Sequence, residues 1–144
     1  MIREILDTEM EQLLELYTHL HDNAMPQKTK ELLMLWESVM KDKNYHIIVA
    51  IEDERVVSSC ICAIIPNFTH NQRPYAIIEN VITRKDYRNR GFASKCLDYA
   101  REIAILNNCY KVMLLTGSKE ESTLNFYIKA GYNYKDKTAF IQWL

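Results

Sequence analysis

The sequence predicts a single domain of mixed α/β class, with antiparallel strands first and one β-α-β unit later in the chain. Two β-branched runs, at 45–52 and 55–65, are separated by only two residues, which is the pattern of a β-hairpin. Two further apolar runs, at 75–83 and 109–116, flank a segment with helical periodicity. Continuous apolar strands joined by a helix indicate a buried parallel pair with a right-handed connection. The length is that of one domain, so we assign residues 1–144 to it.

The segment before the hairpin is expected to hold a short strand and two helices. Residues 1–6 are assigned to the strand. Thr8 and Glu11 form a capping-box pattern that marks the start of the first helix. The apolar residues at helical spacing in this helix are Met10, Leu13, Leu14, Tyr17 and Leu20. A second amphipathic stretch follows Pro26, and its apolar residues are Leu32, Leu33, Trp36, Val39 and Met40.

The segment after the hairpin is expected to hold two helices and a final pair of strands. The crossover helix runs from about 91 to 106, where small and apolar residues recur at three-four spacing. Ser118 and Glu121 form a second capping box, and Gly131 is a natural left-handed stop for the helix that follows. The last residues, YNYKD and KTAFIQWL, predict a terminal hairpin. An exposed strand of this kind could support a homodimer.

Composition and charge exclude several classes of protein. The net charge of −1 argues against a general nucleic-acid binder, which carries a basic surface stripe. No apolar run approaches the ~20 residues of a membrane span, and the acidic start MIREILDTEMEQ is unlike a signal peptide. Cys60 and Cys62 lack the C-x-x-C spacing of zinc and redox sites. We therefore expect four reduced thiols, a cytoplasmic location, and no membrane, nucleic-acid or metal partner.

The stretch RKDYRNRGFAS, directly after the apolar run at 75–83, has the properties of a phosphate-binding loop. It follows the carboxyl end of a strand, where ligands bind in open α/β sheets, and it opens a helix whose first amides lack intrahelical partners. Gly91 allows a close approach of the backbone to a ligand. Five cations surround it against the single acid Asp86: Arg84, Lys85, Arg88, Arg90 and Lys95. The P-loop and Rossmann glycine patterns are absent. A solvated basic helix start would show the same charges, so both interpretations stay open.

Glu79 and Asn80 interrupt the apolar strand just before this loop. A buried carboxylate without a partner is costly, so Glu79 requires an explanation. It is either a general base in a cleft, or a structural carboxylate in a salt bridge or at a strand end that reaches solvent.

Three segments, in order, resemble the GNAT superfamily of N-acetyltransferases. RNRGFA at 88–93 is similar to the acyl-CoA motif R/Q-x-x-G-x-G/A, IIENVIT resembles the central strand, and LNFYIKAGYN at 124–133 resembles the later F-Y-x-x-x-G-F/Y segment. The resemblance covers the chain from about residue 45 to the end. It implies the GNAT fold: a mixed sheet of about six to seven strands with flanking helices and a splayed parallel pair. The stretch from NCYKV to GY also resembles glucosamine-6-phosphate N-acetyltransferases, which is a hint about the substrate.

The resemblance implies that acetyl-CoA is the acetyl donor. The amides of 89–94 would hold the CoA pyrophosphate, and a backbone N–H near Val81 would polarise the acetyl carbonyl while the pantetheine pairs with the strand end. The implied cofactor contacts are Val81, Ile82, Thr83, Arg88, Asn89, Arg90, Gly91, Phe92, Ala93 and Ser94. Tyr127 would protonate the departing thiolate. The sequence departs from the family pattern at Asn89, in place of a frequent second glycine, and at Glu120, in place of an asparagine near the pantetheine.

These roles predict direct transfer in a ternary complex. A primary amine, with a pKa of ~10.4, must lose a proton before it attacks the thioester. Glu79 is the candidate that accepts this proton, directly or through a water, so the cysteines are expected to take no part. The loop at 66–75 is expected beside the acetyl group, where His70 and Arg73 could contact the acceptor, although a lone loop histidine is commonly only solvated.

The function expected from the sequence is acetylation of a primary amine on a small molecule, such as an amino sugar. Two alternatives stay open. One is a non-catalytic acyl-CoA-binding sensor module, and the other is an acetyltransferase that acts on a protein or peptide amine.

Overall fold

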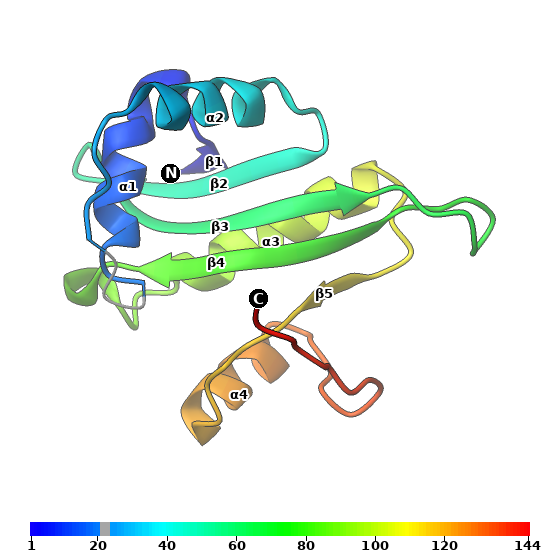
Figure 1. The fold of residues 1–144 in the computed structure, drawn as a ribbon. Helices are drawn as coiled ribbons and strands as arrows, with labels where there is room; N and C mark the ends of the chain where they lie inside the picture. The colour runs from blue at the N-terminus through cyan, green and yellow to red at the C-terminus, as the bar shows by residue number, and fades with distance from the viewer. Residues whose placement is uncertain (21–23) are drawn as a thin grey trace.

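The structure, a computed structural model, describes residues 1–20 and 24–144. These residues form a five-stranded sheet with the order β1-β2-β3-β4-β5 (Figure 1). The strands are β1 Ile2–Glu4, β2 Tyr45–Glu52, β3 Arg55–Ile65, β4 Tyr75–Thr83 and β5 Val112–Leu114. Neighbouring strands are antiparallel except β4 and β5, which are parallel. The expected mixed class, with antiparallel strands first and a parallel pair late, is confirmed.

Helices cover both faces of this sheet. They are α1 Met10–Tyr17, α2 Lys30–Lys41, α3 Phe92–Leu106 and α4 Glu121–Lys129, with short 3-10 turns η1 Asp7–Glu9 and η2 Lys85–Tyr87. In Figure 1, α3 runs behind the sheet, α1 and α2 lie on its other side, and α4 lies beyond β5. Among the described residues, every helix is too short or too polar to cross a membrane.

The sheet separates two hydrophobic cores. On one face α3 buries the positions expected from its three-four spacing: Phe92, Cys96, Leu97, Ala100, Ile103 and Ala104. On the other face Leu13 and Leu16 of α1 pack against Ile47, Val49 and Ile61 of the sheet. Full burial of one such aliphatic side chain contributes about 1.5–3 kcal/mol to stability. The two cores therefore fix the sheet from both sides and leave its β5 end as the less covered part.

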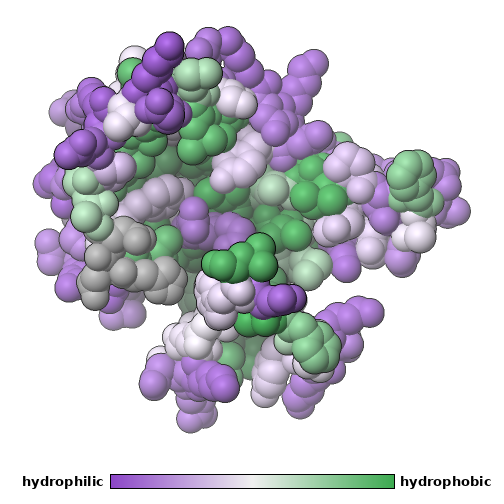
Figure 2. Space-filling model, viewed as in Figure 1, coloured by the Kyte–Doolittle hydropathy of each residue, from purple (hydrophilic) through white to green (hydrophobic). Residues whose placement is uncertain are grey.

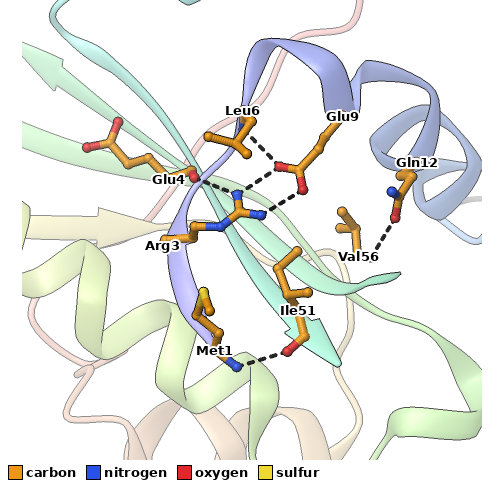
Figure 3. Close-up of polar contacts among 8 residues, drawn as sticks. All are labelled: Met1, Arg3, Glu4, Leu6, Glu9, Gln12, Ile51 and Val56. Carbon is orange, nitrogen blue, oxygen red and sulfur yellow. Dashed lines mark hydrogen bonds and ion pairs between the residues drawn. The ribbon is translucent and has the colours of Figure 1, made fainter. Parts of the chain in front are cut away.

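The start of α1 differs from the sequence prediction. The Thr8–Glu11 capping box is wrong, because the carboxylate of Glu9 makes the equivalent bond two residues earlier. Its Oε2 atom accepts a hydrogen bond from the Leu6 amide at 2.8 Å (Figure 3). The Arg3 guanidinium donates to both oxygens of the same carboxylate, at 2.8 and 2.7 Å. These bonds, above all the one from Arg3, hold the pKa of Glu9 below its usual value.

The start of α4 also differs. Glu120 is the residue that precedes the helix, so Ser118 does not cap it as predicted. Its hydroxyl instead accepts a hydrogen bond from the Glu120 amide at 3.3 Å and donates one to Thr123 Oγ1 at 3.2 Å. The end of the helix is as expected. Gly131 has φ +93°, and the Tyr132 amide donates back to the Tyr127 carbonyl at 3.0 Å, which is a Schellman cap.

The predicted terminal hairpin is wrong. No described residue after Leu114 lies in a strand, and residues 133–144 are exposed throughout. β5 is also shorter than the predicted run 109–116. The sheet thus has five strands in the described chain instead of six or seven. The sequence 138–144 has the residue types of a strand, but a strand needs a neighbour for its backbone groups, and β5 offers only a three-residue edge.

Candidate active site

A bulge interrupts β4 at the point where the polar pair lies. Ile61 of β3 pairs with Glu79 and Ser59 pairs with Ile82, so Asn80 and Val81 together face a single residue of β3. Asn80 has φ +49°, a left-handed conformation that asparagine tolerates better than most residues. A bulge bends its strand and turns backbone groups out of the ladder. The amides near Val81 are therefore released from regular pairing at this point.

Beyond the bulge, β4 and β5 separate. The parallel ladder joins Ala76–Ile78 only to Val112–Leu114. β4 continues to Thr83, whereas the chain after β5 turns away towards α4 (Figure 1). No described strand pairs with the β5-side edge of β4 after Ile78. An extended ligand can bind such an edge as an added strand.

From the end of β4 the chain passes through η2 to the loop that opens α3. Asn89 and Gly91 both have left-handed dihedrals, with φ of 59° and 79°. The first amide here that bonds back into the helix is that of Lys95, at 3.1 Å from the Gly91 carbonyl. Among the described residues, the amides of 89–94 donate to no protein acceptor. Free amides next to left-handed residues at a helix start form an anion-binding concavity.

The two arginines of this loop differ in how they are held. Arg90 donates to Glu52 Oε1 at 3.1 Å and lies over the rings of Tyr87 and Phe92, at 5.0 and 5.3 Å. Arg88 instead donates from Nε to the carbonyl of Thr83 at 3.3 Å, and it forms no ion pair with a described carboxylate. The charge of Arg90 is thus partly used within the protein. The charge of Arg88 is available to an anion.

Tyr127 lies on α4, the helix that follows β5. Its ring packs edge-to-face against Phe126 and Tyr132, with centroids at 4.9 and 6.2 Å. It lies against the core on the α3 side of the sheet. Burial, and secondarily the nearby thiol of Cys60, raises the pKa of Tyr127 above its usual value. The hydroxyl therefore stays protonated at neutral pH and can act as a proton donor.

Glu79 lies on the opposite face. Its direct cross-strand neighbour, Ile61, packs into the core under α1, and opposed residues share a face. Glu79 is exposed, and it makes no ion pair with any residue that the structure describes. Its charge is close enough to Tyr45 to contribute to the raised pKa of that phenol, after burial as the main cause. The exposed geometry does not fit a salt bridge. It fits a carboxylate that solvent reaches, and the role of Glu79 as general base stays a prediction.

His70 and Arg73 do not join these groups. The His70 ring stacks on Tyr110, with centroids 3.8 Å apart. Arg73 donates to the carbonyls of Asn108 and Cys109 at 3.1 and 2.9 Å. Both side chains hold the loop before β4 to the turn after α3, at the end of β4 opposite the phosphate-type loop. The sequence placed this loop beside the acetyl group, and the structure gives that placement no support.

The bulge was not predicted from the sequence, although the sequence contains a signal for it. Asn80 interrupts an apolar strand, and asparagine tolerates left-handed dihedrals. Sequence reasoning also missed the side chains that surround Glu79 and Asn80 on the α1 side. These are Tyr17, Tyr45 and Ser59, which come from three separate elements. No local pattern connects them.

Comparison with known proteins agrees with this architecture. The acetyltransferase (GNAT) family matches residues 6–132. A putative acetyltransferase from Agrobacterium tumefaciens is 33% identical, covers 99% of each chain and superposes with a TM-score of 0.91. An aminoglycoside N-acetyltransferase in complex with CoA has the same fold at 14% identity, with a TM-score of 0.78 over 100% of this chain and 99% of that one.

A curated relative, glucosamine 6-phosphate N-acetyltransferase from Trypanosoma brucei brucei, is 32% identical over 83 residues. The match covers 58% of this chain and 54% of that protein, so it spans about half the length of the relative. With the family matched over nearly the whole chain, the class is clear. The protein belongs to the GNAT family of acetyltransferases, as its motifs predicted.

Proposed function

We propose that this protein transfers the acetyl group of acetyl-CoA to the primary amine of a small molecule, with amino sugars and their phosphates as the first candidates. One observation carries the proposal. The β5-side edge of β4 has no described strand partner after Ile78, and the chain passes from the end of β4 through the short turn η2 to the free amides of 89–94. An extended thiol arm with a pyrophosphate at its end matches that path in shape and charge.

The donor site is built from backbone more than from side chains. The edge of β4 at 81–83 would pair with the pantetheine, and the amides of 89–94 would bind the pyrophosphate, with Arg88 adding charge. Phe92 and Ala93 would contact CoA only through their amides, since the Phe92 ring is buried under Arg90. An aminoglycoside N-acetyltransferase with this fold is known in complex with CoA, which supports CoA as the cofactor.

The two candidate catalytic groups lie on opposite faces of the sheet. Glu79 would take a proton from the acceptor ammonium, directly or through a water. The free amine would attack the thioester carbonyl, whose oxygen is polarised by a bulge amide near Val81. A new C–N bond forms, the C–S bond breaks, and Tyr127 would donate its proton to the thiolate. The attacking nitrogen would then lose its extra proton, through solvent, to the Tyr127 phenolate, which restores the phenol. General acid-base help of this kind is typically worth about 100- to 10,000-fold in rate.

The buried thiols argue for direct transfer without an acyl-enzyme. Burial raises the pKa of Cys62 to about 12 and that of Cys96 to about 11, and it raises the pKa of Cys60 further. A thiol is a nucleophile only as thiolate. At neutral pH these side chains are therefore protonated and unreactive.

The acceptor class rests on the relatives. The curated relative at 32% identity is named for an amino-sugar phosphate, which supports a small polar amine. The test is release of CoA thiol from saturating acetyl-CoA against amino sugars, their 6-phosphates, polyamines, amino acids and short peptides. Turnover above the no-amine background with a small amine supports the proposal. Turnover with peptides alone names a protein acceptor, and a flat panel with acetyl-CoA bound indicates a sensor module.

We also propose that the chain forms a homodimer through residues 138–144. Phe140 and Trp143 in this segment are 92% and 85% exposed, and Figure 2 shows apolar side chains at the surface where the chain ends. The outer edge of β5 has no described partner. A copy of the segment from a second chain would cover both features, in a symmetric exchange. Light scattering after gel filtration should give a dimer for the full chain and a monomer for the chain truncated at residue 137; a monomeric full chain would contradict the proposal.

A further inference from the structure

Two buried hydroxyls beneath the β4 bulge have no role in the function proposed above. They are Tyr17 Oη, on the last residue of α1, and Ser59 Oγ, on β3. Both atoms are out of contact with solvent, and neither has a hydrogen-bond partner among the described residues. Ser59 is fully buried. Buried hydroxyls without a partner are rare in native proteins, so this pair requires an explanation.

The two hydroxyls lie side by side, and Asn80 completes the group. Ser59 and Asn80 lie close enough to the Tyr17 hydroxyl to lower its pKa, but neither contact meets the geometry of a direct hydrogen bond. Burial outweighs this effect and raises the pKa of Tyr17 to about 12. The phenol is therefore a neutral group that can both donate and accept. Three polar side chains from α1, β3 and β4 thus face one another in the interior. Such a group is the usual setting of an ordered internal water, which takes two to four polar partners.

The position of these three side chains allows them to affect the conformation of β4. Ser59 is the last residue of β3 that pairs on one side of the bulge, through Ile82. Asn80 is the left-handed residue of the bulge itself, with φ +49°. A hydrogen-bonded group that joins these two residues to α1 would hold the bulge in one conformation. It would therefore fix the direction of the amides near Val81.

We propose that Tyr17, Ser59 and Asn80 bind a buried water that locks the β4 bulge, and that Tyr17 is a positioning residue for acetyl transfer. The water joins the end of α1 to the bulge and keeps the amide near Val81 aimed at the acetyl carbonyl. The catalytic consequence rests on the proposed function, while the water site does not. Tyr17 acts through the bulge and touches neither substrate.

The kinetic test uses Tyr17→Phe and Ser59→Ala, singly and together. Each single change should lower kcat about tenfold or more, because a small misplacement of a reacting group is costly, and should leave the KM for acetyl-CoA within about twofold. The double variant should be little worse than either single variant, because both remove the same site. The control is Tyr99→Phe on α3, which packs on the other face of the sheet. It should leave kcat unchanged.

The variants should behave differently if the site holds no water. If the two hydroxyls are dry and unpaired, Tyr17→Phe removes a desolvation cost, so the variant should melt at a higher temperature with an unchanged kcat. That outcome would overturn the inference. A Tyr17→Phe variant that unfolds at assay temperature leaves Ser59→Ala to decide the kinetic question.

Two measurements need no activity. A high-resolution crystal structure should show a water within hydrogen-bond distance of Tyr17 Oη and Ser59 Oγ, and a dry site would contradict the proposal. Hydrogen exchange at the amides of 79–82 should speed up in Tyr17→Phe and not in Tyr99→Phe. If the wild-type protein acetylates no amine, the proposed function fails, and these two readouts still decide whether the water site exists.

Discussion

The change Gly91→Ala tests the donor site through a single methyl group. Gly91 has φ +79°, which an L-residue adopts at a cost of about 1–2 kcal/mol. A Cβ built at this position meets no protein atom within 4 Å, so no steric clash adds to that cost. For a chain of this size, ~1–2 kcal/mol lowers the melting temperature by about 3–6 °C. The methyl group would also project into the space assigned to the pyrophosphate.

Gly131→Ala is a matched control for this change. Gly131 has φ +93°, its Cβ would likewise meet no atom within 4 Å, and it lies at the end of α4. Both variants should therefore lose similar stability. Only Gly91→Ala should lose affinity for acetyl-CoA, by tenfold or more, which corresponds to about 1.4 kcal/mol. Calorimetric titration with acetyl-CoA and thermal melting of the free proteins measure the two effects separately.

Two outcomes for the glycine variants would contradict the proposed pyrophosphate site. Equal affinity of Gly91→Ala and the wild-type protein would mean that the pyrophosphate does not bind at the α3 loop. Equal loss of affinity in both glycine variants would mean that the effect comes from general destabilisation.

Three further outcomes follow from the geometry. Arg88→Ala should weaken acetyl-CoA binding about 10- to 100-fold, as expected for the loss of a charge-assisted hydrogen bond. Arg90→Ala should weaken it less, because Glu52 already pairs with the charge of Arg90. Similar losses of affinity in titrations of both variants would contradict the different roles given to the two arginines. Tyr127→Phe should lower kcat about 100-fold with little change in KM, and an unchanged kcat in the thiol-release assay would remove its role as acid. The pKa of Glu9 is lowered in the folded state, so its contribution is present above the unfolded value of ~4.3 and is lost as pH falls through the folded value. Glu9→Gln should therefore cost more stability at pH 7 than at pH 3, and an equal deficit at both pH values in thermal melts would contradict this.

The features that sequence predicted best are those with a local, periodic signal. The hairpin at 45–65, the strand at 75–83 and the crossover helix follow from β-branched runs and three-four spacing, and they appear almost to the residue. The left-handed Gly91 at the start of α3 was also foreseen, because the glycine and the surrounding cations are contiguous in the chain, while phosphate binding there stays a prediction. These elements position the candidate site.

The features that sequence could not predict depend on partners distant in the chain. Residues 138–144 have the residue types of a strand, yet they stay unpaired because no neighbouring strand is available in this chain. The Arg3–Glu9 pair displaces the capping box that local pattern favoured. His70 and Arg73 make a ring stack and hydrogen bonds to backbone carbonyls that no local pattern showed, and their contact with the acceptor stays a prediction. In each case tertiary contacts decided between options that the local sequence left equivalent.

The most direct test of the account is detection of the acetylated product itself. Purified protein, acetyl-CoA and the best amine from the panel would be incubated and analysed by mass spectrometry, beside a Glu79→Gln/Tyr127→Phe double variant. We expect the wild-type protein to form an N-acetylated amine in equal amount to free CoA. We expect the double variant to form much less of this product while its affinity for acetyl-CoA is unchanged. CoA release without an acetylated amine, or equal product from both proteins, would contradict the account.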